Sequence, residues 1–193
     1  MIIVEGPDMI GKTWLANKLV FELNTLGYPV QYAHMSKPPQ GFDYYWGYVN
    51  MMRRNVVMDR FHLGEIVYRP VTEGFTYQTP SQFALLQTKL KRMGAVVVLC
   101  HADPQLIVEQ HRKQVHETEM FPLDAILSAN DGFRECATGV LSRREGRFEV
   151  HVDIEIVVNK NANGEWTWPC QENYVRCIIN EWLYKQRRSY VGL

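Results

Sequence analysis

The sequence has no excess of charge of either sign, because 21 lysines and arginines balance 21 aspartates and glutamates. A surface without a net field does not hold a polyanion over its whole area. This balance argues against a general nucleic-acid binder. It does not exclude a nucleic-acid substrate, and a DNA track would become plausible if two short basic pairs, such as Arg53-Arg54 and Arg143-Arg144, shared one face.

Cysteines are few. Cys100, Cys136, Cys170 and Cys177 include no C-x-x-C pair and lie in segments that otherwise have the pattern of core strand or helix. This usage is typical of reduced, buried thiols in an intracellular protein. We therefore expect a cytoplasmic protein without disulfides.

Long hydrophobic runs are also missing. The longest strongly apolar run, Ala95 to Cys100, is far too short to cross a bilayer. The N-terminal run Met1-Ile2-Ile3-Val4 has neither a basic region nor a cleavage site. These absences predict a soluble protein with no signal peptide and no membrane partner.

Strand-like apolar runs alternate with segments of helical spacing through residue 114. The strand-like runs are 2–4, 30–33, 56–58 and 95–100, and helical spacing covers 14–26, 42–48, 63–68, 81–93 and 104–114. Such alternation implies a parallel sheet covered on both faces. We expect one α/β domain over residues 1–193, with three layers and a doubly wound, mainly parallel sheet of about five strands.

The C-terminal third is less regular. Helix-compatible spacing covers 123–144, and apolar and polar residues alternate over 148–158 as in a strand. Residues 161–164 have the composition of a hairpin turn, with a return strand at 165–168. An amphipathic helix is predicted over 172–188, so we expect a C-terminal β-hairpin followed by a helix.

One segment has the complete pattern G-x-x-x-x-G-K-[ST] of a phosphate-binding P-loop. It follows a hydrophobic strand and leads into a helix, so that backbone N–H groups and the N-terminal end of the helix point at the phosphates. The residues expected to hold ATP or another NTP are Gly6, Pro7, Asp8, Met9, Ile10, Gly11, Lys12, Thr13 and Trp14. In this scheme Lys12 bridges the β- and γ-phosphates and Thr13 ligates Mg²⁺. The alternative is a glycine-rich β-to-α turn with an incidental lysine.

A second motif supplies the carboxylate that P-loop enzymes need at the end of a neighbouring strand. Asp59 ends the apolar run Val56-Val57-Met58, and Arg60 follows it. Asp59 can hold the magnesium water shell or position the acceptor, and the planar fork of Arg60 can neutralise an acceptor phosphate. The alternative is an N-capping aspartate beside a surface arginine.

Residues 57–61 (Val-Met-Asp-Arg-Phe), followed by Glu65 and Tyr68, resemble the Asp-Arg-Tyr segment of thymidylate kinases and their viral relatives. Pro7-Asp8 resembles the Gly-x-Asp form of the loop in the same family. The resemblance covers the first two-thirds of the chain. It implies that Asp8 contacts the sugar hydroxyl of the acceptor, and that Asp59 and Arg60 hold magnesium and the acceptor phosphate.

Two loop positions depart from that family. Met9 and Ile10 stand where a thymidylate kinase can supply a transition-state arginine, so a lid must provide the cations. The lid-like segment 111–121 follows the fourth strand and its helix, and Arg112 and Lys113 are its candidate catalytic and ATP-binding cations. The alternative is a basic helix end that the helix dipole stabilises.

The acceptor side departs as well. Gly64 stands where a serine often follows the Asp-Arg-Tyr segment, and residues 34–39 (His-Met-Ser-Lys-Pro-Pro) replace the usual Arg-Glu-Pro. Both changes lie where the family binds its acceptor. The candidate acceptor-binding residues at these segments are His34, Ser36, Lys37 and Glu65.

Aromatic residues are dense at 42–48, between the second and third strands. Aromatic rings hold bases with about 1–3 kcal/mol per stacked base in single-strand binders. Tyr45, and Phe61 beside Arg60, are the rings that we expect to face the acceptor base. The alternative is an aromatic helix that packs on the sheet.

These motifs together predict an ATP-dependent kinase that transfers the γ-phosphoryl group to a deoxynucleoside monophosphate, such as dTMP or a modified pyrimidine nucleotide. One alternative is a kinase for a hydroxyl of a nucleoside, of a modified base such as hydroxymethyluracil in DNA, or of a DNA end. Asp8 or Asp59 would then act as the base. Another is a nucleotide-binding module without catalysis. Whether the chain forms a homodimer stays open.

Overall fold

The computed structural model describes residues 1–36, 38, 42–113 and 121–191. Its strands are β1 (Ile2–Glu5), β2 (Gln31–His34), β3 (Val56–Asp59), β4 (Val96–Ala102), β5 (Val140–Arg143), β6 (Gly146–Glu149) and β7 (Ile154–Val158). Its helices are α1 (Lys12–Thr25), α2 (Tyr44–Met51), α3 (Leu63–Thr72), α4 (Pro80–Arg92), α5 (Pro104–Lys113), α6 (Leu123–Ala137) and α7 (Glu172–Val191).

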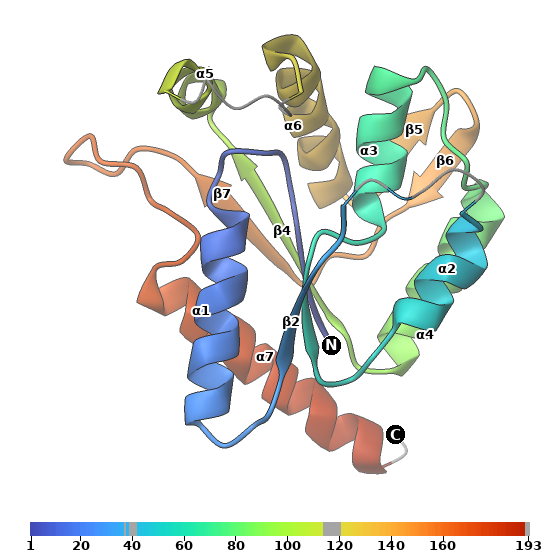
Figure 1. Ribbon diagram of the computed structural model, residues 1–193, viewed down its shortest axis with the longest axis vertical. Coiled ribbons are helices and arrows are strands. Elements are labelled where there is room, and N and C mark those ends of the chain that lie inside the picture. Colours follow the sequence, from blue (N-terminus) through green and yellow to red (C-terminus); the bar gives the residue numbers. More distant parts are fainter. Residues whose placement is uncertain (37, 39–41, 114–120, 192–193) are drawn as a thin grey trace.

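Five parallel strands form the central sheet in the order β2-β3-β1-β4-β7 (Figure 1). β1 lies in the middle, because the chain extends the sheet first to one side of β1 and then to the other. A sheet wound in this way has a crevice at the carboxyl ends of its strands, where the order reverses. The doubly wound, parallel five-stranded α/β fold predicted from the sequence is therefore confirmed.

Helices cover both faces of this sheet, and successive strand residues point to opposite faces. Ile3 packs in one core with α2, α3, α4 and α6. Ile2 and Val4 pack in the other, with α1, α5 and α7. In Figure 1, α1 and α7 lie on one side of the sheet and α3 and α4 on the other. Burial of such a side chain stabilises the fold by about 1.5–3 kcal/mol, so β1 requires apolar residues on both faces.

The helix predicted over 123–144 is wrong at its C-terminal end, because α6 stops at Ala137. Gly139 adopts a φ of 85°, in the left-handed region that commonly ends helices. The chain then forms the antiparallel pair β5–β6, in which Leu141 lies opposite Phe148. Both side chains are fully buried, so the apolar spacing near Leu141 belongs to a strand.

The single strand predicted over 148–158 is likewise wrong, because it is two strands. β6 ends at Glu149, and β7 joins the central sheet as a parallel neighbour of β4. The Asp153 carboxylate accepts hydrogen bonds from Val97 N–H at 2.8 Å and from Lys185 Nζ at 2.5 Å, which hold the start of β7 against β4. Apolar and polar residues alternate across the break, so the alternation does not reveal it.

The turn predicted at 161–164 is confirmed. Gly164 N–H donates to the Asn161 carbonyl at 2.9 Å. The return strand is reduced to one antiparallel bridge between Lys160 and Trp166. Helix α7 follows, as predicted for 172–188.

Burial of the cysteines is confirmed for Cys100 and Cys136 only, since Cys170 is partly exposed and Cys177 exposed. The prediction of four buried thiols is therefore wrong for the last two. Among the residues that the structure describes, no helix combines the length and apolar character needed to cross a membrane.

Candidate active site

The loop between β1 and α1 has a backbone that only certain residues can adopt. Gly6 has a φ of 146°, and a Cβ there would lie 2.3 Å from the carbonyl oxygen of Cys100. Gly11 and Met9 also have positive φ values, of 84° and 71°. The side chain of Ile10 is fully buried and ties the loop to the core. The motif glycine at position 6 is thus required both by conformation and by space.

Lys12 is held inside this loop. Its side chain is almost completely buried, and Nζ donates to the carbonyl of Pro7 and lies 3.7 Å from Asp8 Oδ1. Burial lowers the pKa of Lys12, and the charge of Asp8 offsets part of that effect. Phosphate oxygens form stronger, charge-assisted hydrogen bonds with an ammonium group than a backbone carbonyl does, so a phosphate in the loop can recruit Nζ.

Asp59, at the end of β3, is bonded by three neighbours. Its Oδ2 accepts a hydrogen bond from Thr13 Oγ1 at 2.7 Å and one from the hydroxyl of Tyr32 at 3.1 Å, and lies 3.1 Å from Nδ1 of His34. Burial by itself raises the pKa of Asp59. The Thr13 hydrogen bond, the charge of Lys12 and the contact with His34 outweigh burial and hold that pKa below its usual value. The carboxylate is therefore ionised at neutral pH.

The two predicted metal ligands thus lie together, and their chemistry fits Mg²⁺. Oδ1 of Asp59 is buried and has no hydrogen-bond partner among the described residues. Mg²⁺ prefers oxygen ligands and is usually held by one or two carboxylates together with substrate phosphates. Asp59 and Thr13 offer a carboxylate and a hydroxyl beside the phosphate-binding loop.

Arg60 has an unusual backbone, with a φ of 67°. Its N–H donates to the carbonyl of Val4 at 2.9 Å. Glu5 Oε1 accepts hydrogen bonds from the N–H groups of Phe61 at 3.1 Å and Leu63 at 2.8 Å. A left-handed conformation costs a non-glycine residue roughly 1–2 kcal/mol, which these bonds to β1 offset. They aim the Arg60 side chain at Asp8, whose Oδ1 lies 2.5 Å from Nη2.

Glu5 is a residue that the sequence-based prediction missed. It is 1% exposed and lies 3.6 Å from Nδ1 of the equally buried His62. Burial raises the pKa of Glu5 to about 7, although the two backbone hydrogen bonds and the charges of Lys12 and Arg60 act in the opposite direction. An acidic residue within a hydrophobic strand is costly unless it is bonded, so its position directly before Gly6 is a usable signal.

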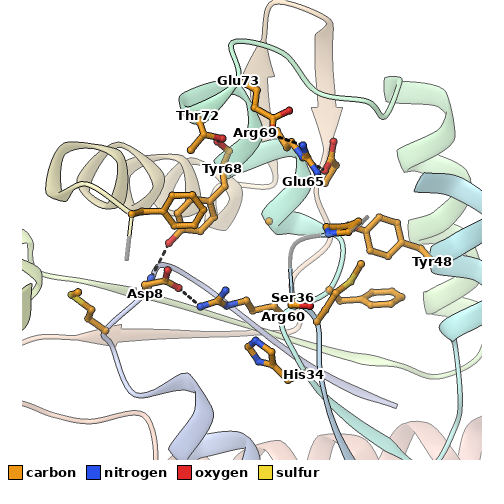
Figure 2. Close-up of a pocket in the computed structure, with 16 residues that line it drawn as sticks. Asp8, His34, Ser36, Tyr48, Arg60, Glu65, Tyr68, Arg69, Thr72 and Glu73 are labelled. Carbon is orange, nitrogen blue, oxygen red and sulfur yellow. Dashed lines mark hydrogen bonds and ion pairs between the residues drawn. The ribbon is translucent and has the colours of Figure 1, made fainter. Parts of the chain in front are cut away.

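Two adjoining cavities lie at the carboxyl ends of the strands. A cavity of about 230 Å³ lies at the P-loop and includes Lys12, Thr13 and Trp14 in its lining. A larger cavity of about 810 Å³ lies beside α3 (Figure 2). The residues that line both cavities are Asp8, Met9 and Arg60. A ligand in one cavity can therefore approach a ligand in the other beside Arg60.

No protein-family model matches the chain. Over 131 residues, which are 66% of the chain, it is 31% identical to the SPbeta prophage-derived uncharacterized protein YorR of Bacillus subtilis (strain 168), and the match covers 77% of YorR. The chain belongs to the YorR family.

The fold of this YorR family member is similar to a crystal structure of YorR from Bacillus subtilis in complex with phosphorylated GDP. The TM-score is 0.64 at 22% sequence identity, and the match covers 93% of each chain. This likeness supports the α/β fold. The narrower resemblance to thymidylate kinases stays a prediction.

Most of the predicted acceptor-binding residues line the larger cavity of this YorR family member. They are Asp8, His34, Ser36, Arg60, Phe61 and Glu65. Tyr45 is absent from the described lining of either cavity, and its ring packs edge-on against Trp46 at 5.2 Å. Tyr48, one turn later on α2, lines the larger cavity instead. Lys37 lies outside the described residues.

The predicted lid cations lie at the end of α5. Arg112 and Lys113 are exposed and absent from the described lining of both cavities, whereas Gln110 lines the P-loop cavity. Residues 114–120 of the expected lid lie outside the described residues. At its far end, Phe121 lines the larger cavity and stacks on Tyr68 at 5.1 Å. The roles of Arg112 and Lys113 therefore stay predictions.

Two further aromatic residues of the YorR family member belong to the site. The hydroxyl of Tyr68 accepts a hydrogen bond from the N–H of Asp8 at 2.8 Å, which ties α3 to the P-loop. Trp168 lines the P-loop cavity, 5.9 Å from the ring of Trp14. Tyr68 was signalled by its place in the Asp-Arg motif. Trp168 had no such signal, because it comes from the segment predicted as a return strand.

Proposed function

We propose that this protein is an ATP-dependent kinase that transfers the γ-phosphoryl group to a deoxynucleoside monophosphate. The observation that carries the proposal is the meeting of the P-loop cavity and the larger cavity at Asp8, Met9 and Arg60. Phosphoryl transfer needs the acceptor oxygen and the leaving oxygen in line on either side of the transferred group. Two nucleotides in adjoining cavities meet that requirement.

Four residues at or beside this junction have a task in the proposal. Lys12 moves from the carbonyl of Pro7 to the β- and γ-phosphates of ATP. Arg60 holds the acceptor phosphate through its planar fork. Asp59 and Thr13 would hold Mg²⁺, which offsets negative charge on the phosphates. The acceptor is a phosphate oxygen that is already ionised, so no general base is needed.

The bound ligand of YorR supports a phosphorylated nucleotide as the ligand class, since that protein was crystallised with phosphorylated GDP. Asp8 and the Asp59-Arg60-Phe61 segment extend the proposal to an acceptor such as dTMP or a modified pyrimidine nucleotide, on the resemblance to thymidylate kinases. Arg112 and Lys113 remain the proposed lid cations.

The proposal is tested by incubating the protein with ATP, Mg²⁺ and each deoxynucleoside monophosphate and measuring diphosphate and ADP. Lys12→Met should lower turnover by about 100-fold or more, because it removes a donor to the transferred group. Lys18→Met is the matched control, since Lys18 lies on the outer face of α1, paired with Glu22 at 2.6 Å. Formation of no diphosphate from any acceptor contradicts the proposal.

A hydroxyl kinase is the second candidate, with a nucleoside, hydroxymethyluracil in DNA or a DNA end as acceptor. An attacking alcohol needs a base. The lowered pKa of Asp59, which follows from the Thr13 bond, Lys12 and His34 outweighing burial, makes it a weak one. The same assay with nucleosides and modified DNA in place of monophosphates distinguishes the two kinases. Binding of ATP without any turnover would indicate the non-catalytic module.

A further inference from the structure

Arg69 forms part of the wall of the larger cavity that lies across from the P-loop. Figure 2 shows Arg69 with Glu65 and Glu73 on one side of the cavity and Asp8 and Arg60 on the other. Arg69 is 8% exposed, which is unusual for an arginine. Arg69 thus lies across the larger cavity from the place where the two cavities meet. We therefore expect it to contact a different part of a ligand from the part that Arg60 contacts.

Neighbouring side chains fix the guanidinium of Arg69. Nε donates to Glu65 at 3.1 Å, one terminal nitrogen donates to Glu73 at 2.5 Å, and the other donates to the hydroxyl of Tyr44. The group also lies over the rings of Tyr44 and Tyr77, which stack on each other at 4.9 Å. The donor fork is therefore in place before a ligand enters, so binding costs little side-chain entropy.

Glu65 is fixed by hydrogen bonds of its own, so it can position the side chain of Arg69. Its Oε1 accepts hydrogen bonds from the N–H of Tyr77 at 2.9 Å and from the hydroxyl of Thr76 at 3.3 Å. Glu145, on the turn between β5 and β6, in turn accepts a hydrogen bond from the N–H of Thr76 at 3.1 Å. The β5–β6 hairpin thus supports the far wall of the cavity.

The remaining donors of Arg69 are suited to a neutral acceptor. Each terminal nitrogen keeps one N–H that has no hydrogen-bond partner among the described residues. Two carboxylates offset the charge of Arg69, whereas Arg60 is paired with Asp8 and its side chain is 35% exposed. Arg60 therefore suits the phosphate of an acceptor nucleotide, and Arg69 suits a carbonyl oxygen at the opposite end of that nucleotide.

Base edges differ in the groups that they present to such a wall. Guanine presents the O6 carbonyl beside N1–H, and thymine and uracil present the O4 carbonyl beside N3–H. An arginine N–H matches the carbonyl oxygen of each of these bases. Adenine and cytosine present an amino group at the same position, so that donor meets donor.

We infer that Arg69, which the carboxylates of Glu65 and Glu73 hold in position, recognises the acceptor base and selects oxo bases over amino bases. The inference rests on the proposed function, since it places a nucleotide with its phosphate at Arg60 and its base at Arg69. It names the acceptor class as guanine, thymine, uracil and thymine-like modified bases.

The test measures binding of five monophosphates to the full chain by calorimetry, together with kcat/KM for each with ATP. Two comparisons are matched in size: dGMP against dAMP, and dTMP and dUMP against dCMP. The oxo member of each comparison should bind about tenfold more tightly or better, in the range found for matched base contacts. Equal affinities within both comparisons overturn the inference, while turnover with any of the five leaves the kinase proposal standing.

Two variants test whether Arg69 is the residue that causes the preference for oxo bases. Arg69→Lys keeps the charge and removes the planar fork, so the oxo preference should shrink to less than about threefold. Arg60→Lys, the matched substitution at the junction, should weaken all five monophosphates by a similar factor. An oxo preference that Arg69→Lys leaves unchanged overturns the assignment. Circular dichroism shows whether Arg69→Lys folds. If it does not, the affinities of the wild-type protein for oxo-base and amino-base monophosphates decide whether the inference holds. Binding of none of the five overturns the inference and the proposed function together.

Discussion

Glu5 and Asp59 flank the P-loop, and their environments shift their pKa values in opposite directions. Glu5 is buried among backbone N–H groups, and burial raises its pKa to about 7. Asp59 is also buried, but Thr13, Lys12 and His34 together hold its pKa below the usual value. Local environment therefore distinguishes the two residues: Asp59 is an ionised carboxylate, and Glu5 anchors the turn that carries Arg60.

Replacing Glu5 by glutamine tests the anchor. Glutamine keeps a carbonyl oxygen for the N–H groups of Phe61 and Leu63 and removes the buried charge. The pKa of Glu5 is about 7 in the folded protein, against 4.5 for an exposed glutamate. The folded state binds more protons between these values, so its free energy of unfolding falls as pH rises through them. Near pH ~8, Glu5→Gln should be about 3 kcal/mol more stable than the wild type.

Urea unfolding of both proteins at several pH values measures this difference. The pKa of His62, lowered to about 3 by burial, makes wild type and variant alike less stable as pH falls below 6.5. The difference between the two proteins therefore isolates Glu5. An advantage of Glu5→Gln that stays constant from acid to alkaline pH contradicts the assignment.

Asp59→Asn tests the metal site. Asparagine can still accept hydrogen bonds from Thr13 and Tyr32, but it lacks the negative charge that attracts a divalent cation. We expect turnover to fall by about 100-fold or more and the Mg²⁺ concentration for half-maximal activity to rise. Asp103→Asn is the control, because Asp103 caps the start of α5 through the N–H of Gln105 and lies outside the described lining of both cavities. Unchanged Mg²⁺ dependence in Asp59→Asn argues against the site.

At the level of secondary structure, the sequence predicts the strands and helices of the first 113 residues. In each of these segments the apolar residues have one regular spacing, and the segment has a distinct end. The wrong boundaries lie where the spacing of apolar residues continues unchanged from one element into the next. Gly139 ends α6, yet Leu141 continues the apolar spacing of the helix into β5. Asp153 starts β7 through Val97 and Lys185, which are distant in sequence. Such contacts exist only in the folded chain.

The loop between β1 and α1 gives a prediction at this scale. Gly27→Ala, at a φ of 83° with no atom within 4 Å of the new Cβ, should cost only the strain of a left-handed residue, roughly 1–2 kcal/mol. Gly6→Ala also has a backbone penalty, at a φ of 146°, and its Cβ would lie 2.3 Å from the Cys100 carbonyl. It should therefore destabilise the protein more than Gly27→Ala and abolish ATP binding. Equal unfolding free energies of the two variants contradict the packing described for the loop.

At the scale of the whole molecule, the site joins side chains from distant parts of the chain. The P-loop and the Asp59-Arg60 pair are predictable, because each motif is local in sequence. Arg69 and Trp168 are not, because each comes to line a cavity only when the sheet brings α3 or the segment before α7 into place. Tyr45 and Tyr48 have the same local pattern, and only packing decides that Tyr48 faces the larger cavity.

The two adjoining cavities predict an optical signal that distinguishes their ligands. Trp168 lines the P-loop cavity and is absent from the described lining of the larger one. Addition of ATP should therefore change tryptophan fluorescence, and Trp14→Phe and Trp168→Phe together should remove most of that change, because both rings line this cavity. Trp46→Phe is the control, since Trp46 is exposed on α2 and lies outside the described lining of both cavities. A deoxynucleoside monophosphate that alters Trp168 fluorescence as strongly as ATP would show that the two ligands share one cavity.

In the proposed reaction, a phosphoryl group passes between nucleotides where the cavities meet at Asp8 and Arg60. ATP that carries a label at its γ-phosphate tests this transfer. With Mg²⁺ and an oxo-base deoxynucleoside monophosphate, the label should appear in the corresponding diphosphate, and Arg60→Lys should slow its appearance. Label that stays in ATP, or that is released only as inorganic phosphate with every monophosphate supplied, contradicts the claim.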